Sequence, residues 1–239
     1  MVRFNAEGTG ASLAVVATLA TLTMVLPSFT LTGPGLAFSP LQLGFAAVAS
    51  LVLYAGFVIT QTVRHRDFFL PVSTRGQAKN RGHAPRPAVR ATAISFGLLC
   101  VALISVVGLA KTVSPTIEAG VAAAGIPKSF VGVVIALLVL MPEALAATRA
   151  AARDRMQTSL NLGYGSAMAS IGLTIPSIAV ASIWLEGPLT LGLGPTEIVL
   201  LVLTVIVGAL TVAPGRATRL QGILHLVIFF AFLFLAMVP

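Results

Sequence analysis

Long apolar runs dominate the chain and are separated by shorter polar connections. A helix needs about 20 apolar residues to cross the hydrocarbon core of a bilayer, and it satisfies its own backbone groups within lipid. Seven runs meet this requirement: 10–28, 41–62, 91–112, 129–148, 159–184, 195–213 and 220–238. The pattern therefore predicts an all-α polytopic membrane protein with about seven transmembrane helices.

Composition supports the same class. Of the 239 residues, 57% are hydrophobic and only 9% are charged, whereas about 25% of residues in a soluble domain are charged. The single cysteine, Cys100, lies inside an apolar run, which excludes a disulfide framework and indicates a buried structural thiol. The run after Arg3 is similar to a signal peptide, but Asn5 and Glu7 precede it and no small-residue cleavage site follows. We therefore expect an uncleaved first span.

The positions of the basic residues predict the orientation in the membrane. In a seven-span topology, Lys111 and Lys128 fall on one side and the other thirteen of the 15 Lys and Arg residues on the opposite side. Those thirteen are Arg3, Arg64, Arg66, Arg75, Lys79, Arg81, Arg86, Arg90, Arg149, Arg153, Arg155, Arg216 and Arg219. Because positive residues mark the cytoplasmic side, we expect the N-terminus inside and the C-terminus outside, in a bacterial cytoplasmic membrane. Cations confined to connections also argue against nucleic-acid binding, despite the net charge of +8.

The connection at residues 64–90 is the only long polar stretch, and it is rich in Pro, Gly and basic residues. This composition is typical of a flexible linker. We expect it to lie in the cytoplasm between two transmembrane helices (1–63) and a five-helix unit (91–239). Its cations would fix the topology; binding to anionic lipid headgroups is the alternative role.

Glu143 is unusual because it is an ionisable residue at the end of the apolar run in VIALLVLMPEALAATRAAARDR (134–155). A charge at the centre of a membrane helix costs about 2.5–3.5 kcal/mol or more. Pro142 removes a backbone donor and should kink or unwind the helix, which would free carbonyl oxygens of the preceding turn. Transporters build cation sites from such broken helices, so we predict that Glu143 binds a cation. The alternative is an ion pair with Arg149 or Arg153.

The next span, SLNLGYGSAMASIGLTIPSIAVASIW (159–184), offers further oxygen atoms. Ser166, Ser170 and Thr174 recur every four residues and form one polar stripe on a helix, and Asn161 precedes them. Hydroxyl and carbonyl oxygens suit a hard cation such as Ca²⁺, which takes about six to eight oxygen ligands. Because a carboxylate binds either a cation or a proton, this chemistry predicts cation/proton exchange.

A packing role for the same span is the alternative interpretation. Small polar side chains often hold membrane helices together, and Gly163, Gly165 and Gly172 would allow another helix to approach closely. Pro176 is expected to kink the second half of the span.

These two spans carry a resemblance to a known family. The segment ALLVLMPEALAATRAAARDRMQTSLNLGYGSAMASIGLTIPSIAV (136–180) resembles the second repeat of bacterial calcium/proton antiporters, in the cation/calcium exchanger superfamily. The shared pattern is Pro-Glu in one span, a basic link, and then LN…GS…A…LT-P in the next. The ending RATRLQGILHLVIFFAFLFLAMV (216–238) is similar to the last span of that family.

The resemblance implies a fold of two inverted five-helix repeats, each giving one acidic residue to a central cation site. Glu143 takes the position of the second repeat's acidic ligand, and Gly165 and Ser166 match the Gly-Ser of the partner span. Four more residues fall in the similar stretch: Asn161, Ser170, Thr174 and Pro176. Leu140 and Ala169 stand where some members have Asn and Gln, so selectivity among Ca²⁺, Na⁺ and K⁺ stays open. The transported ion expected first is Ca²⁺, with H⁺ as counter-ion and no cofactor.

The family has more spans than this chain, which matches only its last seven. Spans one and two contain no Asp or Glu for the first repeat's acidic position. One carboxylate cannot neutralise a divalent ion, and burying the excess charge is costly. We therefore expect a separate first-repeat polypeptide to complete the site. A homodimer of inverted halves would need dual topology, which the charge bias opposes; an inactive remnant is the other alternative.

The remaining candidates do not change this prediction. His225 could pass protons, but a hydrogen-bonded packing role near the inner end of the last span is favoured. No Ser/His/Asp arrangement, metal-ligand cluster or phosphate loop supports an enzyme. The chain is expected to be part of a secondary transporter. The alternative is a non-transporting membrane subunit in which Glu143 pairs with nearby arginines.

Overall fold

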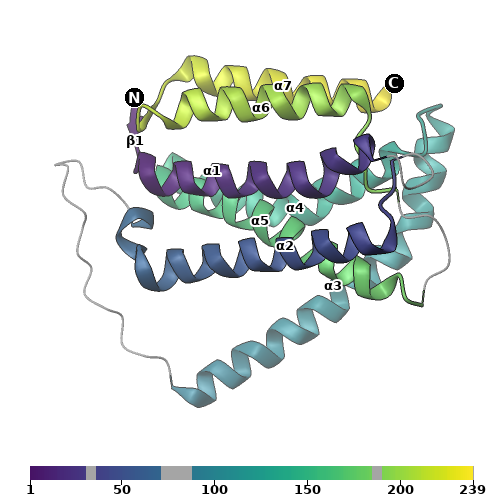
Figure 1. Cartoon of the computed structure of the whole chain (residues 1–239), viewed down its shortest axis with the longest axis horizontal. Helices are drawn as coiled ribbons and strands as arrows, with labels where there is room; N and C mark the ends of the chain where they lie inside the picture. Colours follow the sequence, from purple (N-terminus) through teal and green to yellow (C-terminus); the bar gives the residue numbers. More distant parts are fainter. Residues whose placement is uncertain (31–35, 71–87, 185–189, 239) are drawn as a thin grey trace. The chain divides into compact units, whose positions relative to one another are not determined.

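The computed structural model describes residues 1–30, 36–70, 88–184 and 190–238. Within these ranges, seven helices are long and apolar enough to cross a membrane, which confirms the predicted all-α polytopic class. They are α1 (Ala6–Ala20), α2 (Pro40–Ile59), α3 (Val89–Ala123), α4 (Phe130–Ala152), α5 (Met156–Ala181), α6 (Pro195–Val212) and α7 (Arg219–Met237) (Figure 1). Two short strands, β1 (Val2–Arg3) and β2 (Arg216–Ala217), form an antiparallel ribbon.

Side-chain caps determine where the first two helices begin. The Asn5 side chain accepts hydrogen bonds from the backbone N–H groups of Glu7 and Gly8, as expected of an N-cap residue. Ser39 and Gln42 form a capping box around Pro40 at the start of α2. Both helices then continue beyond their α-helical part: α1 through a π-turn (η1, Thr21–Val25) and a 3-10 turn (η2, Leu26–Phe29), and α2 through a π-turn (η3, Thr60–Arg64).

Helix α3 is longer than the sequence predicts. The expected span ends at residue 112, but the helix runs from Val89 to Ala123 and continues through Pro115. Lys111 and Glu118 therefore lie within a helix, and the predicted end of this helix at residue 112 is wrong. The polarity of this segment marks the end of the apolar run, but residues such as Ala, Lys and Glu still favour the helical backbone.

The start of the predicted linker is also packed. A 3-10 turn, η4 (Arg66–Phe69), follows α2, and the Phe69 side chain is only 6% exposed. Its ring meets that of Phe57 edge to face, with centroids 5.6 Å apart, an arrangement that aromatic pairs favour. The central part of the predicted linker, residues 71–87, lies outside the described residues.

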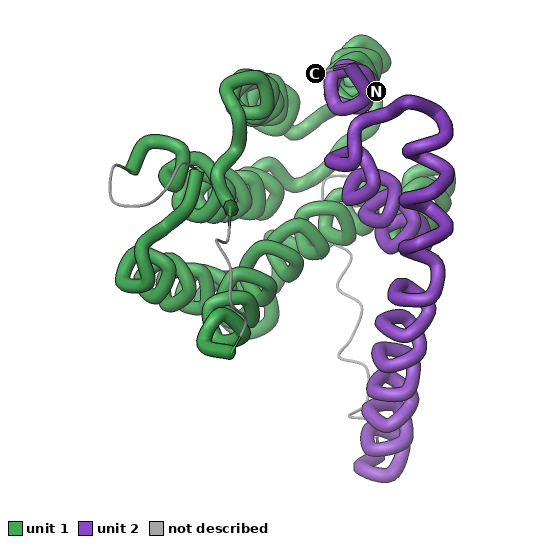
Figure 2. Tube along the Cα trace, turned by 90° about the vertical axis from the view of Figure 1, so that its right-hand side faces the viewer, with its two compact units in different colours: residues 1–79, 143–229 green, residues 80–142, 230–239 purple. Residues whose placement is uncertain are grey.

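The chain forms two compact units (Figure 2). Unit 1 comprises Met1–Lys79 and Glu143–Phe229, and unit 2 comprises Asn80–Pro142 and Phe230–Pro239. One boundary between the units thus falls within α4, between Pro142 and Glu143, and another falls within α7, between Phe229 and Phe230. Each unit is made of two separate segments of the sequence. The predicted division into 1–63, 64–90 and 91–239 uses continuous segments that correspond to the expected repeats, and it stays a prediction.

Helix α5 is central to unit 1 because it packs against both α1 and α2. Leu19 of α1 and Met168 of α5 are fully buried, and Phe57 of α2 joins them in one hydrophobic cluster. Elsewhere many large apolar side chains are exposed. In a soluble protein such a surface would indicate a binding patch, but helices in a membrane present it to lipid.

Helix α2 approaches α5 closely at Gly172. A Cβ atom added there would lie 2.9 Å from Cβ of Tyr54, so any side chain would force the two helices apart. Gly163 and Gly165, on the same helix, have no atom within 4 Å of such a Cβ. Of the three glycines expected to admit a neighbouring helix, Gly172 does so among the described residues.

This difference predicts opposite effects of the same substitution. Gly172→Ala should destabilise unit 1 by about 1–3 kcal/mol because it overpacks the α2–α5 contact. Gly163→Ala should stabilise it by up to about 1 kcal/mol, because alanine favours the helix and no atom lies in its way. Thermal unfolding of the purified chain in detergent measures both. Equal midpoints for the two variants would contradict the close contact.

Candidate cation site

Glu143 of α4 and Ser166 of α5 meet within unit 1. The Ser166 Oγ donates a hydrogen bond to Oε2 of Glu143. The connection between the two helices is short, from Arg153 to Arg155, and it includes Asp154 at a φ of 56°. Each member of the pair lies about 15 Å along its helix from this connection, at about 1.5 Å rise per residue. Glu143 and Ser166, which are 23 residues apart in the sequence, thus lie at the same height along the two neighbouring helices.

This depth argues against a purely peripheral role for Glu143. Glu143 is the fifteenth residue of the 24-residue span Ser129–Ala152, so it lies near the middle of an apolar helix and not at its end. Among the described residues, Glu143 forms no ion pair with Arg149 or Arg153, and its hydrogen-bond partner is Ser166. The ion pair considered as an alternative from the sequence is therefore not formed in this structure.

The prolines do not interrupt their helices. Helix α4 is continuous through Pro142, and α5 is continuous through Pro176. The expected unwinding at Pro142 is therefore wrong, because the neighbouring backbone hydrogen bonds maintain the helix around one missing donor. A bend at either proline stays a prediction. The missing N–H of Pro142 still withholds one backbone donor from the preceding turn of α4.

The remaining stripe residues of α5 have no hydrogen-bond partner in the part of the chain that the structure describes. Ser170 and Thr174 are exposed, and within the described residues neither side chain forms a hydrogen bond. They lie one and two turns beyond Ser166 on roughly the same face. Gly165 is half-buried beside Ser166. The hydroxyl groups of Ser170 and Thr174 are thus unpaired oxygens continuing from the Glu143–Ser166 pair.

Asn161 takes part in a separate network at the start of α5. Its Nδ2 donates to the Phe69 carbonyl oxygen at 2.7 Å, and its Oδ1 accepts from Nε2 of Gln157 at 2.9 Å. Both polar ends of the amide are therefore engaged with protein. The structure does not bring Asn161 to Glu143 by a hydrogen bond, and its role as a cation ligand stays a prediction.

Gln157 is the centre of that network, and sequence reasoning missed it. Its side chain is 2% exposed; its Oε1 accepts from the Asn5 N–H at 2.7 Å, and its Nε2 also lies 3.3 Å from Oγ1 of Thr9. In the sequence it stands among the polar residues between two spans, where a glutamine normally faces water. Its partners Asn5 and Thr9 lie 152 and 148 residues away in the sequence, so no local pattern indicates the network.

His225 belongs to α7, and its side chain faces α6. Its Nε2 is 3.2 Å from Oγ1 of Thr211, in agreement with the hydrogen-bonded packing role favoured from the sequence. Among the described residues, no group of three or more His, Cys, Asp or Glu side chains could hold a metal ion. The candidate site therefore consists of one carboxylate and several neutral oxygens.

Comparison with known proteins identifies the family. Residues 94–238 match the model described as sodium/calcium exchanger protein. The chain belongs to the sodium/calcium exchanger family. This match includes α4 and α5, and it confirms the resemblance to cation/calcium exchangers seen in the sequence. No solved structure matches the chain significantly.

Two curated relatives of this exchanger-family chain are transporters by name. A protein of Sinorhizobium fredii named as ionic transporter y4hA is 43% identical over 99% of this chain and 63% of its own length. The sodium-potassium/proton antiporter ChaA of Escherichia coli is 28% identical over 89% of this chain and 58% of its own length. The chain thus spans about three fifths of the length of these relatives. The names describe ion transport in the first relative and cation/proton antiport in the second.

The network around Gln157 gives a test of packing at the start of α5. Gln157→Leu should destabilise the chain by about 1–3 kcal/mol, because the Asn5 N–H would be left without its acceptor in a buried setting. Gln61→Leu is a matched control, since the Gln61 side chain has no hydrogen bond among the described residues. Thermal unfolding in detergent compares them. An equal midpoint for both variants would show that the network contributes nothing.

Proposed function

We propose that this chain is part of a secondary transporter that exchanges Ca²⁺ for protons, with Glu143 as the group that binds them in turn. The observation that supports this most directly is the hydrogen bond from Ser166 to Glu143. It brings a carboxylate and a hydroxyl together about halfway along two membrane-spanning helices. Placing an ionisable group at that depth costs free energy, and such groups within membrane spans usually mark functional sites.

The geometry suits alternating occupancy. The hydrogen bond from Ser166 occupies Oε2 of Glu143 and holds the carboxylate in place, while Oε1 has no partner among the described residues. An ionised carboxylate presents Oε1 to a cation, and the lone pairs of the Ser166 hydroxyl can supply a second oxygen. When a proton binds instead, the charge that attracted the cation is lost. Competition for one carboxylate therefore couples the two ions.

Ser170 and Thr174 extend the proposed site along α5. Their unpaired hydroxyl groups continue from Ser166 and could replace part of the hydration shell of a cation moving along the helix. Alternating access would arise from rocking of one repeat against the other, as in other inverted-repeat transporters.

One carboxylate leaves the site incomplete for a divalent ion. Glu143 carries a single negative charge, and leaving the second charge of Ca²⁺ unbalanced within a membrane is costly. We propose that a further polypeptide equivalent to a first exchanger repeat supplies the second acidic group. This chain covers 63% and 58% of the lengths of the two relatives, so each relative has a further segment that could correspond to such a repeat. The proposed orientation places the N-terminus inside and the C-terminus outside, as the basic residues predict.

The ion is tested directly because one relative is named as a sodium-potassium/proton antiporter. The chain is co-expressed with the part of the y4hA protein that it does not cover, and everted membrane vesicles are prepared. A pH-sensitive dye then reports proton efflux on addition of Ca²⁺, Na⁺ or K⁺. We expect the response to Ca²⁺ to saturate at the lowest concentration.

Glu143→Gln should abolish this exchange, because the amide keeps the shape but can neither hold the negative charge nor titrate. Glu143→Asp should retain part of it. Glu118→Gln is the matched control: it removes the same charge from another membrane-spanning helix, where Glu118 has no hydrogen bond among the described residues. Flux through Glu143→Gln equal to wild type would overturn the proposed role. Absence of flux for every ion in the wild-type assembly would favour a non-transporting subunit.

Ser166→Ala tests the second oxygen of the site. Without the donated hydrogen bond, binding of the cation to the carboxylate should weaken by about 1–3 kcal/mol. The half-saturating Ca²⁺ concentration should therefore rise about five- to 150-fold, while maximal flux falls less. Ser177→Ala on the same helix is the control, because the Ser177 Oγ bonds only to the Leu173 carbonyl oxygen within α5. An unchanged half-saturating concentration in Ser166→Ala would exclude Ser166 as a ligand.

A further inference from the structure

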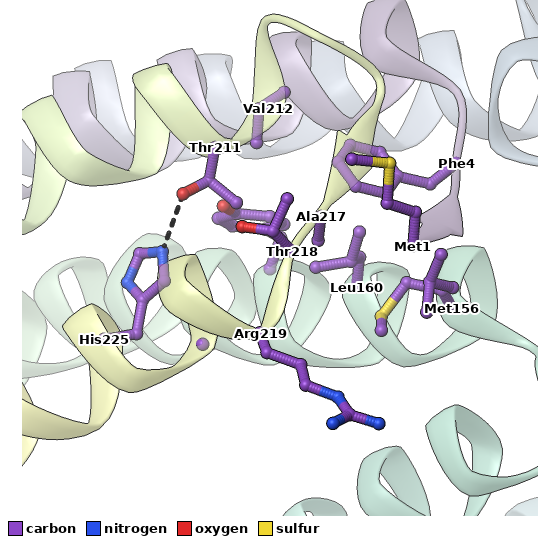
Figure 3. A pocket seen from close by; sticks show the side chains of 13 residues that line it. Met1, Phe4, Met156, Leu160, Thr211, Val212, Ala217, Thr218, Arg219 and His225 are labelled. Atoms are coloured by element: carbon purple, nitrogen blue, oxygen red, sulfur yellow. Dashed lines mark hydrogen bonds between the residues drawn. The ribbon is translucent and has the colours of Figure 1, made fainter.

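A cavity of about 450 Å³ lies in unit 1 beside the beginning of the chain. Its wall is formed by the N-terminal residues, the start of α5 and the turn between α6 and α7 (Figure 3). Met1, Phe4, Met156 and Leu160 give it a mainly apolar lining. The volume is within the range of about 300–1,000 Å³ that is usual for ligand pockets. It is separate from the Glu143–Ser166 pair, since neither residue lines it.

The ribbon of β1 and β2 covers one side of this cavity. Val2 pairs with Ala217, and both line the cavity. Because successive side chains of a strand point to opposite faces, the next pair, Arg3 and Arg216, lies together on the other face. Directly opposed side chains have Cβ atoms about 4.5–5.5 Å apart, and two like charges at that distance repel each other.

No acidic side chain relieves this repulsion among the described residues. Arg3 and Arg216 are exposed and form no ion pair there, and Glu7, the nearest acidic residue in the sequence to β1, does not pair with either. Arg219 is a third unpaired cation: it belongs to the cavity wall, and its guanidinium extends away from the apolar lining (Figure 3). An apolar cavity with Arg219 in its wall, and with two further arginines on the outer face of the ribbon that covers it, fits a ligand that has an anionic head and an apolar body.

We propose that this end of unit 1 binds an anionic phospholipid of the membrane. The acyl chain occupies the cavity and the phosphate lies against Arg219, while the opposed pair Arg3 and Arg216 on the outer face of the ribbon adds positive charge that attracts the anionic head. Arginine suits this role because its planar guanidinium forms paired hydrogen bonds with phosphate oxygens. The basic residues place this end of the protein at the cytoplasmic leaflet, which carries the anionic lipids. Bound phosphate would also relieve the repulsion across the ribbon.

The test uses the purified chain in a neutral detergent. Native mass spectrometry compares retention of phosphatidylglycerol with that of phosphatidylcholine bearing the same acyl chains. We expect wild type to retain phosphatidylglycerol preferentially, and R3Q/R216Q to retain about tenfold less of it, because two positive charges close to the anionic head are removed. R149Q/R153Q is the matched control: it removes two exposed arginines that belong neither to the ribbon over the cavity nor to the cavity wall, and it should retain the lipid as wild type does.

A second variant tests the cavity without changing charge and covers the case that R3Q/R216Q fails to fold. Gly222 lines the cavity, and no atom lies within 4 Å of a Cβ placed on it. Gly222→Leu should therefore fill part of the cavity and lower phosphatidylglycerol retention, whereas Gly97→Leu on α3, equally open, should not.

Three results would overturn the proposal. Equal retention of the two lipids by wild type would exclude recognition of the anionic head. Retention unchanged in either R3Q/R216Q or Gly222→Leu would exclude this site. Displacement of phosphatidylglycerol by inorganic phosphate at the same concentration would mean that the arginines bind a free anion and that the cavity adds nothing.

Discussion

The packing of α5 against α1 and α2 is the interaction on which the rest of unit 1 depends. One side of α5 is buried, with Met168, Gly172 and Ile175 inside the protein. The opposite side then presents Ser166, Ser170 and Thr174. A helix held this firmly on one face has little freedom to rotate, because rotation would open the contact at Tyr54 and expose Met168. The apolar contacts thereby determine where the hydroxyl groups point, and with them the partner available to Glu143.

The polar network at the start of α5 adds a second restraint. Buried amides are costly unless every donor and acceptor is paired, and Gln157 meets this condition through Asn5, Thr9 and Asn161. The same bonds connect α5 to the beginning of α1 and, through Phe69, to the segment after α2. Sliding of α5 along its axis would break several of them together. Hydrophobic contacts therefore limit rotation, and hydrogen bonds limit translation.

Much of the fold follows from the sequence, because lipid imposes strong constraints on it. Apolar runs about 20 residues long must be helices, and all seven are found. Helix ends are less predictable: the polar residues Lys111 and Glu118 end an apolar run but not a helix. Phe69 shows the same limitation. Its ring packs against Phe57, which precedes it across a turn, and its carbonyl oxygen accepts a hydrogen bond from Asn161, which is 92 residues away in the sequence.

The candidate site could be predicted in part for similar reasons. Glu143 and Ser166 can be recognised from the sequence alone, because Glu143 is a carboxylate in an apolar run and Ser166 belongs to a stripe of hydroxyls at helical spacing. Asn161 carries the same kind of signal, yet its amide is satisfied elsewhere, because Gln157 and the Phe69 carbonyl oxygen are closer partners. Only the tertiary arrangement shows which oxygens remain unpaired.

The lengths of the helices have a consequence for the membrane itself. At about 1.5 Å per residue, the 35 residues of α3 extend over about 52 Å, whereas the 18 residues of α6 extend over about 27 Å. The hydrocarbon core is about 30 Å thick, so α3 has length to spare while α6 is barely long enough. Helix α6 cannot lengthen, since Gly194 and Pro195 begin it and the turn at Gly215, with φ of 64°, closely follows it. Hydrophobic mismatch therefore acts first on α6. A bilayer whose hydrocarbon core is thicker than the length of α6 must thin around this helix, so a core of about that thickness places the least strain on it.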